Sequence, residues 1–225
     1  MIHIKQLSKA YGSHLVLDDI NLMINPGQVT GIVGKNGAGK TTLFKCLSHL
    51  ESYAGSIESP YQPLKDHLGF LPTIPYFFKL MTGAEYIRLL CNAKKVDVPD
   101  LKKINIFSLP LDEYAVHYST GMKKKLALTA LLQLKNQVYI LDEPFNGVDI
   151  QSNLIIDEII SRLKGRGHTI LISSHIFSTL EKSCDVIHLL TEGKITKSVG
   201  PDQFSLLHEE MKDASIDSLV NRLEF

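Results

Sequence analysis

The chain has 225 residues, of which 44% are hydrophobic, so it is long enough to bury a substantial core. Lys and Arg together number 24, as do Asp and Glu, and this balance argues against a general basic field for nucleic acid or an anionic membrane. The three cysteines lack C-x-x-C spacing, which is typical of a reducing compartment, and no apolar run approaches the roughly 18 residues of a membrane-spanning helix.

Short strands are predicted at the start of the chain. Residues 1–5 favour a strand rather than a signal peptide, and residues 15–24 predict a second strand. Asn25-Pro26-Gly27 has the composition of a hairpin turn. The apolar run Val29–Val33 then predicts a third strand, which leads directly into a glycine-rich segment.

That glycine-rich segment matches the pattern G-x-x-x-x-G-K-[ST] and reads Gly34-Lys35-Asn36-Gly37-Ala38-Gly39-Lys40-Thr41. A helical pattern from Thr42 to Leu50 follows, so backbone N–H groups and a helix N-terminus would face the same anion. Glycines permit close approach and positive φ angles. We therefore predict a phosphate-binding loop, in which Lys40 bridges the terminal phosphates and the Thr41 hydroxyl ligates Mg²⁺. The alternative is a plain glycine-rich turn.

From about residue 73 to 127 the pattern is helical, with an amphipathic stretch from Gly83 to Cys91. Ser119 is predicted to cap a further helix, which places Lys123-Lys124-Lys125 in its first turn. Cations there oppose the helix dipole by about 0.3 kcal/mol each, a small penalty that a bound anion would reverse. A solvated lysine run is the alternative explanation.

The apolar run at residues 138–142 predicts a strand that is buried on both faces, and the run at residues 168–174 predicts a further strand. The first run ends in Asp142-Glu143. We predict that Asp142 holds Mg²⁺ through its waters and that Glu143 lies beside the attacking water. A surface turn is the alternative, because Pro144 and Gly147 are typical turn residues. A helical tail is predicted over residues 203–223.

Together these motifs resemble the nucleotide-binding subunit of an ATP-binding-cassette (ABC) transporter over about residues 1–200. Ser119-x-Gly121 resembles the signature loop of that family, in the S-x-G-M form of bacterial export ATPases. The resemblance implies that Tyr11 stacks on adenine, that Asp149 touches the partner subunit, and that His175 contacts the γ-phosphate. Thr73 stands where the family usually has a glutamine that reaches toward the metal and the attacking water, and a threonine has a shorter arm.

The resemblance also implies a fold and an assembly. The expected fold is α/β: a P-loop NTPase core (about 1–72 and 128–200) with a small antiparallel β subdomain, an inserted helical subdomain (about 73–127) and a C-terminal tail (about 201–225). ATP and Mg²⁺ would bind at residues 34–42 with Thr41, Asp142 and Thr73 on the metal side, and Ser119 and Gly121 of a second copy would complete the site. Lys40, Glu143 and His175 would be the catalytic residues.

The expected partners are therefore a second copy of the chain and a membrane-spanning permease, with the protein peripheral on the cytoplasmic face of the membrane. A soluble ABC ATPase of metallocluster assembly, DNA or the ribosome would use the same site, although the neutral charge and single cassette disfavour nucleic acid. A P-loop kinase would share the first motif only. The aromatics of segment 75–80 predict either a partner anchor or part of the helical subdomain's own core.

Overall fold

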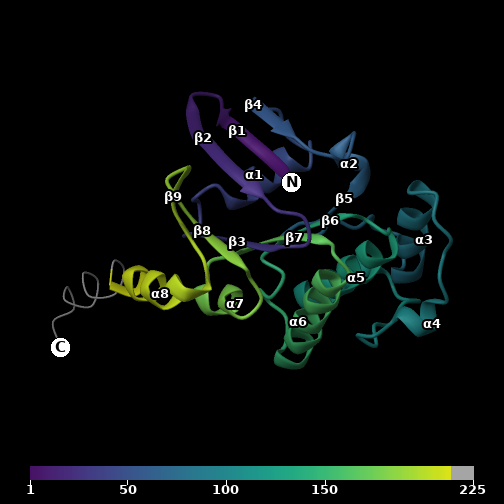
Figure 1. Cartoon of the computed structure of the whole chain (residues 1–225). Coiled ribbons are helices and arrows are strands. Elements are labelled where there is room, and N and C mark those ends of the chain that lie inside the picture. Colours follow the sequence, from purple (N-terminus) through teal and green to yellow (C-terminus); the bar gives the residue numbers. More distant parts are fainter. Residues whose placement is uncertain (214–225) are drawn as a thin grey trace.

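Two sheets organise the chain in the computed structural model, which describes residues 1–213 (Figure 1). The smaller sheet is antiparallel with the order β2-β1-β4, and the larger has the order β5-β6-β7-β3-β8-β9. The strands are β1 (Ile2–Tyr11), β2 (His14–Ile24), β3 (Val29–Val33), β4 (Ala54–Glu58), β5 (Leu68–Leu71), β6 (Val138–Asp142), β7 (Thr169–Ser174), β8 (Val186–Thr191) and β9 (Lys194–Val199).

The middle of the larger sheet is parallel and buried. Every residue of β3, β6 and β7 is buried, as expected for apolar strands that are covered on both faces. Strand β7 pairs in parallel with β6 on one side and with β3 on the other, so that Ser173 lies opposite both Asp142 and Ile32. Strand β5 continues the parallel pairing beside β6. The carboxyl ends of these four strands therefore meet at one edge of the sheet.

Helices cover both faces of the larger sheet. Helix α1 lies between the two sheets, α5, α6 and α7 cover the opposite face, and α3 and α4 project to one side (Figure 1). The α-helices are α1 (Lys40–Leu47), α2 (Leu64–His67), α3 (Gly83–Ala93), α4 (Leu101–Ile104), α5 (Thr120–Gln133), α6 (Ile150–Gly165), α7 (Phe177–Glu181) and α8 (Phe204–Asp213), and the 3₁₀ turns are η1 (Ala115–His117) and η2 (Pro201–Gln203).

Two hydrophobic clusters correspond to these layers. One joins the smaller sheet and α1 to the near face of β6 and β7, through residues such as Leu17, Phe44 and Ile140. The other packs α3, α5, α6 and α7 against the far face, through residues such as Ile87 and Leu126. The sheet is thus held from both sides, which leaves its carboxyl edge as a rigid platform for polar side chains.

Several predictions from the sequence can be compared with this fold. The mixed α/β class with a small antiparallel sheet is confirmed. The prediction of a hairpin at Asn25-Pro26-Gly27 is wrong, because this turn leads from β2 in one sheet to β3 in the other. The hairpin turn at this end of the chain is Gly12-Ser13, between β1 and β2. A subdomain boundary near residue 127 would fall inside α5, which is one continuous helix.

The predicted C-terminal helical tail is helical as far as the structure describes it. Helix α8 covers residues 204–213, and the rest of the predicted tail lies outside the described residues. Cys46, Cys91 and Cys184 are all buried free thiols. Within residues 1–213, none of the helices combines the length and the apolar character needed to cross a membrane.

Candidate nucleotide-binding site

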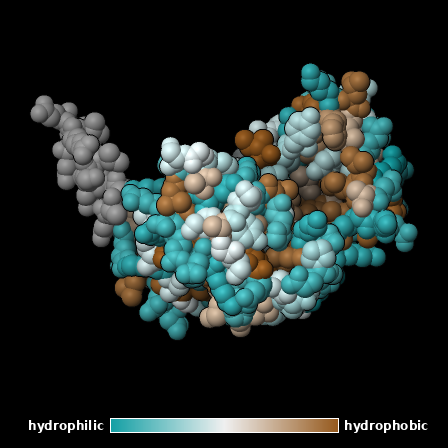
Figure 2. Space-filling model, turned by 90° about the horizontal axis from the view of Figure 1, so that it is seen from above, coloured by the Kyte–Doolittle hydropathy of each residue, from teal (hydrophilic) through white to brown (hydrophobic). Residues whose placement is uncertain are grey.

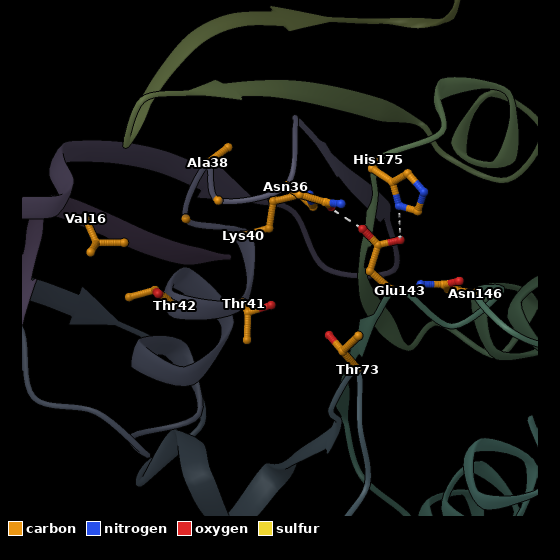
Figure 3. A pocket seen from close by; sticks show the side chains of 12 residues that line it. Val16, Asn36, Ala38, Lys40, Thr41, Thr42, Thr73, Glu143, Asn146 and His175 are labelled. Atoms are coloured by element: carbon orange, nitrogen blue, oxygen red, sulfur yellow. Dashed lines mark hydrogen bonds and ion pairs between the residues drawn. The ribbon is translucent and has the colours of Figure 1, made fainter. Parts of the chain in front are cut away.

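Four segments meet at the carboxyl edge of the larger sheet and line an open pocket of about 470 Å³ (Figure 3). They follow β3, β5, β6 and β7, so the parallel register brings together parts of the chain that are more than one hundred residues apart. Ligands of open α/β sheets bind at this kind of edge. The residues that line the pocket are Val16, Asn36, Gly37, Ala38, Gly39, Lys40, Thr41, Thr42, Thr73, Glu143, Asn146 and His175.

The glycine-rich segment forms the loop that its pattern predicts. Helix α1 begins at Lys40, and its N-cap Gly39 has φ +108°, a conformation that favours glycine. A Cβ atom on Gly34 would lie 2.3 Å from the backbone oxygen of Leu190, so a larger residue could not fit there. The Lys40 ammonium donates to the carbonyl oxygens of Gly34 at 2.7 Å and Lys35 at 3.2 Å. The lysine charge is therefore held inside the loop where phosphates would bind.

Asp142 is fully buried and accepts hydrogen bonds from three hydroxyl groups. Thr41 and Thr73 both donate to its Oδ2 atom, at 2.7 and 2.5 Å, and Ser173 donates to Oδ1 at 2.5 Å. These are hard oxygen donors around one carboxylate, which is the chemistry that Mg²⁺ prefers. The structure thus brings the three predicted metal-side residues together. It adds Ser173, whose only signal in the sequence is a polar residue in a buried strand.

Glu143 is buried beside the phosphate loop and contacts two predicted catalytic residues. Its Oε2 atom lies 2.9 Å from Nδ1 of His175, and its Oε1 atom lies 3.5 Å from the Lys40 ammonium (Figure 3). Its backbone is left-handed, with φ +51°, and its N–H donates to the Ser173 hydroxyl at 2.9 Å. A left-handed non-glycine residue stores about 1–3 kcal/mol of strain, so the surrounding contacts must hold Glu143 in place.

Tyr11 lies at the end of β1 and is not among the residues that line the pocket. Burial and a hydrogen bond with Glu51 raise the pKa of its phenol, while a hydrogen bond with Thr42 opposes this change. The Lys9 ammonium lies 4.8 Å from the ring centroid. Tyr11 is therefore adjacent to the start of α1, at the rim of the site. Val16, which has no motif to mark it, is the β2 residue that lines the pocket.

Ser119, Gly121 and Asp149 are likewise outside the set of residues that line the pocket. Ser119 caps α5 as predicted and accepts from the Met122 N–H. Asp149 caps α6, where hydrogen bonds from the N–H and hydroxyl of Ser152 and from Lys125 hold the pKa of its carboxyl well below its usual range. The chain by itself does not bring these three predicted residues to its own phosphate loop.

A phosphate loop, a buried aspartate that accepts three hydroxyl hydrogen bonds, an adjacent buried glutamate and a histidine at the edge of one parallel sheet define a P-loop nucleotide-binding protein. Comparison with known proteins identifies the class more closely. Residues 17–146 match the ABC transporter family. The chain therefore belongs to this family, as an ATP-binding subunit of the ABC ATPase class.

Individual relatives agree with this assignment. The lantibiotic transport ATP-binding protein SrtF of Streptococcus pyogenes is 34% identical over 207 residues, which cover 87% of this chain and 89% of the relative. A solved ATP-binding subunit of an ABC transporter is 26% identical, with a TM-score of 0.82 over 95% of this chain and 98% of that one. A dimeric ATP-binding cassette in a post-hydrolysis state with ADP and phosphate has the same fold, at 18% identity and a TM-score of 0.81 over 89% of this chain and 99% of that one.

Proposed function

We propose that this chain hydrolyses ATP to drive a separate membrane-spanning export permease. The observation that carries this proposal is the direct contact of Glu143 with both Lys40 and His175 at the phosphate loop. Lys40 and the amides at the start of α1 offset phosphate charge, Glu143 accepts a proton from the attacking water, and His175 contacts the γ-phosphate. Tyr11, at the rim of the site, stacks on adenine.

Thr41 and Asp142 would hold Mg²⁺, which supplies charge neutralisation at the β- and γ-phosphates when bound. The convergence of two threonine hydroxyls on one carboxylate oxygen supports this assignment. Thr73 donates to Asp142 and so orients the metal-side carboxylate from the loop after β5. This role needs only the short arm of a threonine, unlike the reach of the glutamine usual in the family.

A second copy of the chain would complete each nucleotide site. Ser119 and Gly121 lie at the start of α5, outside the pocket of their own chain, and Ser119 is exposed. The post-hydrolysis cassette of the same fold is dimeric. For this chain we propose a head-to-tail pair, because Ser119 and Gly121 lie outside the pocket of their own chain. In such a pair the N-terminus of α5 would face the phosphates across the interface, where its partial positive charge is favourable.

A permease would dock beside the loop that carries Thr73. Ile74, Tyr76 and Leu80 are each more than 70% exposed in segment 74–80, which is unusual for large apolar side chains on one short connection. Figure 2 shows hydrophobic residues around a hollow between the core and the helical part of the molecule, on the side away from the C-terminal end. The transport role in the name of the Streptococcus relative supports a role of this chain in transport. In this proposal the protein is peripheral on the cytoplasmic membrane face.

The function is tested by Glu143→Gln. We expect ATP binding to be retained and hydrolysis to fall about 10²–10⁴-fold, because the amide cannot accept the proton from water. The variant should accumulate an ATP-dependent dimer, measured by light scattering, which the wild-type protein disperses by turnover. Normal hydrolysis by this variant would show that Glu143 is not the base.

The contribution of Ser119 to the nucleotide site of a second copy is tested by two matched variants, Ser119→Asp and Ser119→Asn. Both residues are good N-caps, so both variants should keep α5 intact. Only Asp places a negative charge next to the phosphates bound by the partner. We expect Ser119→Asp to abolish the ATP-dependent dimer in the Glu143→Gln background, while Ser119→Asn retains it. Equal behaviour of the two variants would argue against a contact of Ser119 with phosphate.

A further inference from the structure

Three consecutive lysines follow the signature loop, and the structure gives them different surroundings. Lys123 is half-buried, and its side chain makes no hydrogen bond to any described residue. Lys125 forms an ion pair with Asp149 at 3.0 Å. Lys124 is only 1% exposed. Lysine is almost never fully buried without partners, so the surroundings of Lys124 require an explanation.

The Lys124 ammonium holds the loop that carries the general base. It donates to the carbonyl oxygen of Glu143 at 2.6 Å and to that of Asn146 at 2.8 Å. Charge-assisted hydrogen bonds of this kind are roughly twice as strong as neutral ones, and more so at a buried site. Both residues also line the nucleotide pocket (Figure 3). The lysine therefore acts on the backbone of the pocket wall without entering the pocket.

These bonds act where the backbone is strained. Glu143 has a left-handed φ of +51°, and its N–H is held by Ser173 on the strand side. Lys124 holds the carbonyl on the other side of the same residue. The two bonds together fix the peptide planes that flank Glu143, and thereby the direction in which its carboxylate leaves the backbone.

The first turn of α5 touches the same loop at two further points. A Cβ atom on Gly121 would lie 2.5 Å from the carbonyl oxygen of Gly147, so the helix and the loop are in close backbone contact. Lys125 binds Asp149 at the end of the loop. The helix that begins with the signature loop is thus joined to residues 143–149 along their whole length.

We propose that Lys124 is a positioning residue for Glu143, which holds the general base in its strained backbone conformation from the signature helix. This role rests on the proposed function of Glu143. It also means that the helix which would contact the partner's nucleotide is attached, through Lys124, to the base of its own site. Lys124 itself does not touch the reacting atoms.

A double-mutant cycle with Lys124→Met and Glu143→Gln tests the proposal on the full chain. Met keeps the volume and removes the donors, and replacing a buried charge by an apolar residue is often tolerated by the fold. We expect Lys124→Met to lower kcat about 10–100-fold, as misplacement of a catalytic group does, with nucleotide Kd unchanged within about twofold. In the Glu143→Gln background the same change should alter kcat by less than about twofold, because the positioned group is already lost.

Lys102→Met, at an exposed lysine of α4 outside the residues that line the pocket, is the control and should keep wild-type kcat. If Lys124→Met does not fold, Lys124→Gln replaces it in the cycle, since an amide keeps one donor on a shorter arm and should give a smaller loss. An equal loss of kcat from Lys124→Met in the wild-type and Glu143→Gln backgrounds would overturn the proposal. A folded Lys124→Met variant with wild-type kcat would overturn it as well. If Glu143→Gln itself hydrolyses ATP normally, the assignment of the base fails instead.

Discussion

The nucleotide pocket and the segment that follows Thr73 differ in whether their side chains find contact partners within the chain. In the pocket, the fully buried Asp142 accepts three hydrogen bonds from within the chain, and Glu143 contacts Lys40 and His175. In segment 74–80, large apolar groups are left in contact with water. The first region is a preorganised site, whereas the second is an exposed apolar surface, which we propose as the docking surface of the permease.

Thr73 is the link between these regions, since its hydroxyl belongs to the pocket and its chain continues into the exposed segment. A partner that moves segment 74–80 would thereby act on the metal-side carboxylate. We propose that transport and hydrolysis are coupled at this link. Substitutions at Lys40, at Phe77 and Phe78, at His188 and at Thr73 test the comparison of the two regions.

The largest expected effect is in the pocket. Lys40→Ala should abolish measurable ATP hydrolysis and weaken ATP binding, because a full charge near the terminal phosphates is lost from a partly desolvated site. Lys45→Ala, five residues further along α1, is the control and should hydrolyse normally. Turnover in Lys40→Ala equal to that of the wild type would show that the phosphate loop is assigned wrongly.

Phe77 and Phe78 separate core from surface inside the exposed segment. Phe77 is buried and its ring lies 4.5 Å from that of Tyr86, whereas Phe78 is half exposed and packs edge-on against Tyr76 at 5.5 Å. Phe77→Ser should therefore lower the free energy of unfolding by about 3–5 kcal/mol. Phe78→Ser should change the melting temperature little and reduce co-purification with the membrane. Loss of stability in both variants would mean that the whole segment is core.

His188, in strand β8 of the larger sheet, is a buried polar group that has a hydrogen-bond partner among the described residues for only one of its two ring nitrogens. Its Nδ1 atom lies 2.7 Å from the Ser198 hydroxyl, its Nε2 atom is buried without a described partner, and burial lowers the pKa of the imidazole to about 4. Above pH 6.5 neither the folded nor the unfolded state binds this proton. Below that pH the unfolded state alone takes it up, so the free energy of unfolding should fall by about 3 kcal/mol between pH 6.5 and 4.

The variant for this test is His188→Leu, with denaturant unfolding followed from pH 7 to 4. It should lose that part of the pH dependence, whereas His14→Leu, at an exposed histidine, should keep it. The same pH slope in wild type and His188→Leu would show that the imidazole is protonated in the folded protein.

The smallest effect concerns Thr73 itself. Thr73→Val removes the hydrogen bond to Asp142 at nearly constant volume and should weaken Mg²⁺ binding to the ATP-bound protein about tenfold, as loss of an outer-sphere partner does. Thr73→Ser should restore it. Thr73→Gln tests the departure from the family, because a longer amide that reaches metal and water would keep or raise ATPase activity. Collapse of activity at an unchanged melting temperature would show that the site is built around threonine.

Local patterns were sufficient for much of the site. The phosphate loop, the strand that ends in Asp142, the strand before His175 and the Ser119 cap each depend on neighbours in the chain, so spacing and hydrophobic runs predicted them. Family resemblance then supplied roles that the residues alone did not, such as those of Tyr11 and Asp149. Their contacts with nucleotide and partner stay predictions.

Only the tertiary structure decided which groups meet across long sequence distances. The register of β6 against β7 places Ser173 on Asp142, and close packing of α5 on the loop after β6 buries Lys124 against two carbonyl groups. In sequence, Lys124 is one of three equal lysines, because a helix exposes each of its faces to a different environment that composition does not record. The sequence by itself determined the chemistry of the phosphate loop, while the packing of sheet and helix determined what holds Glu143 in place.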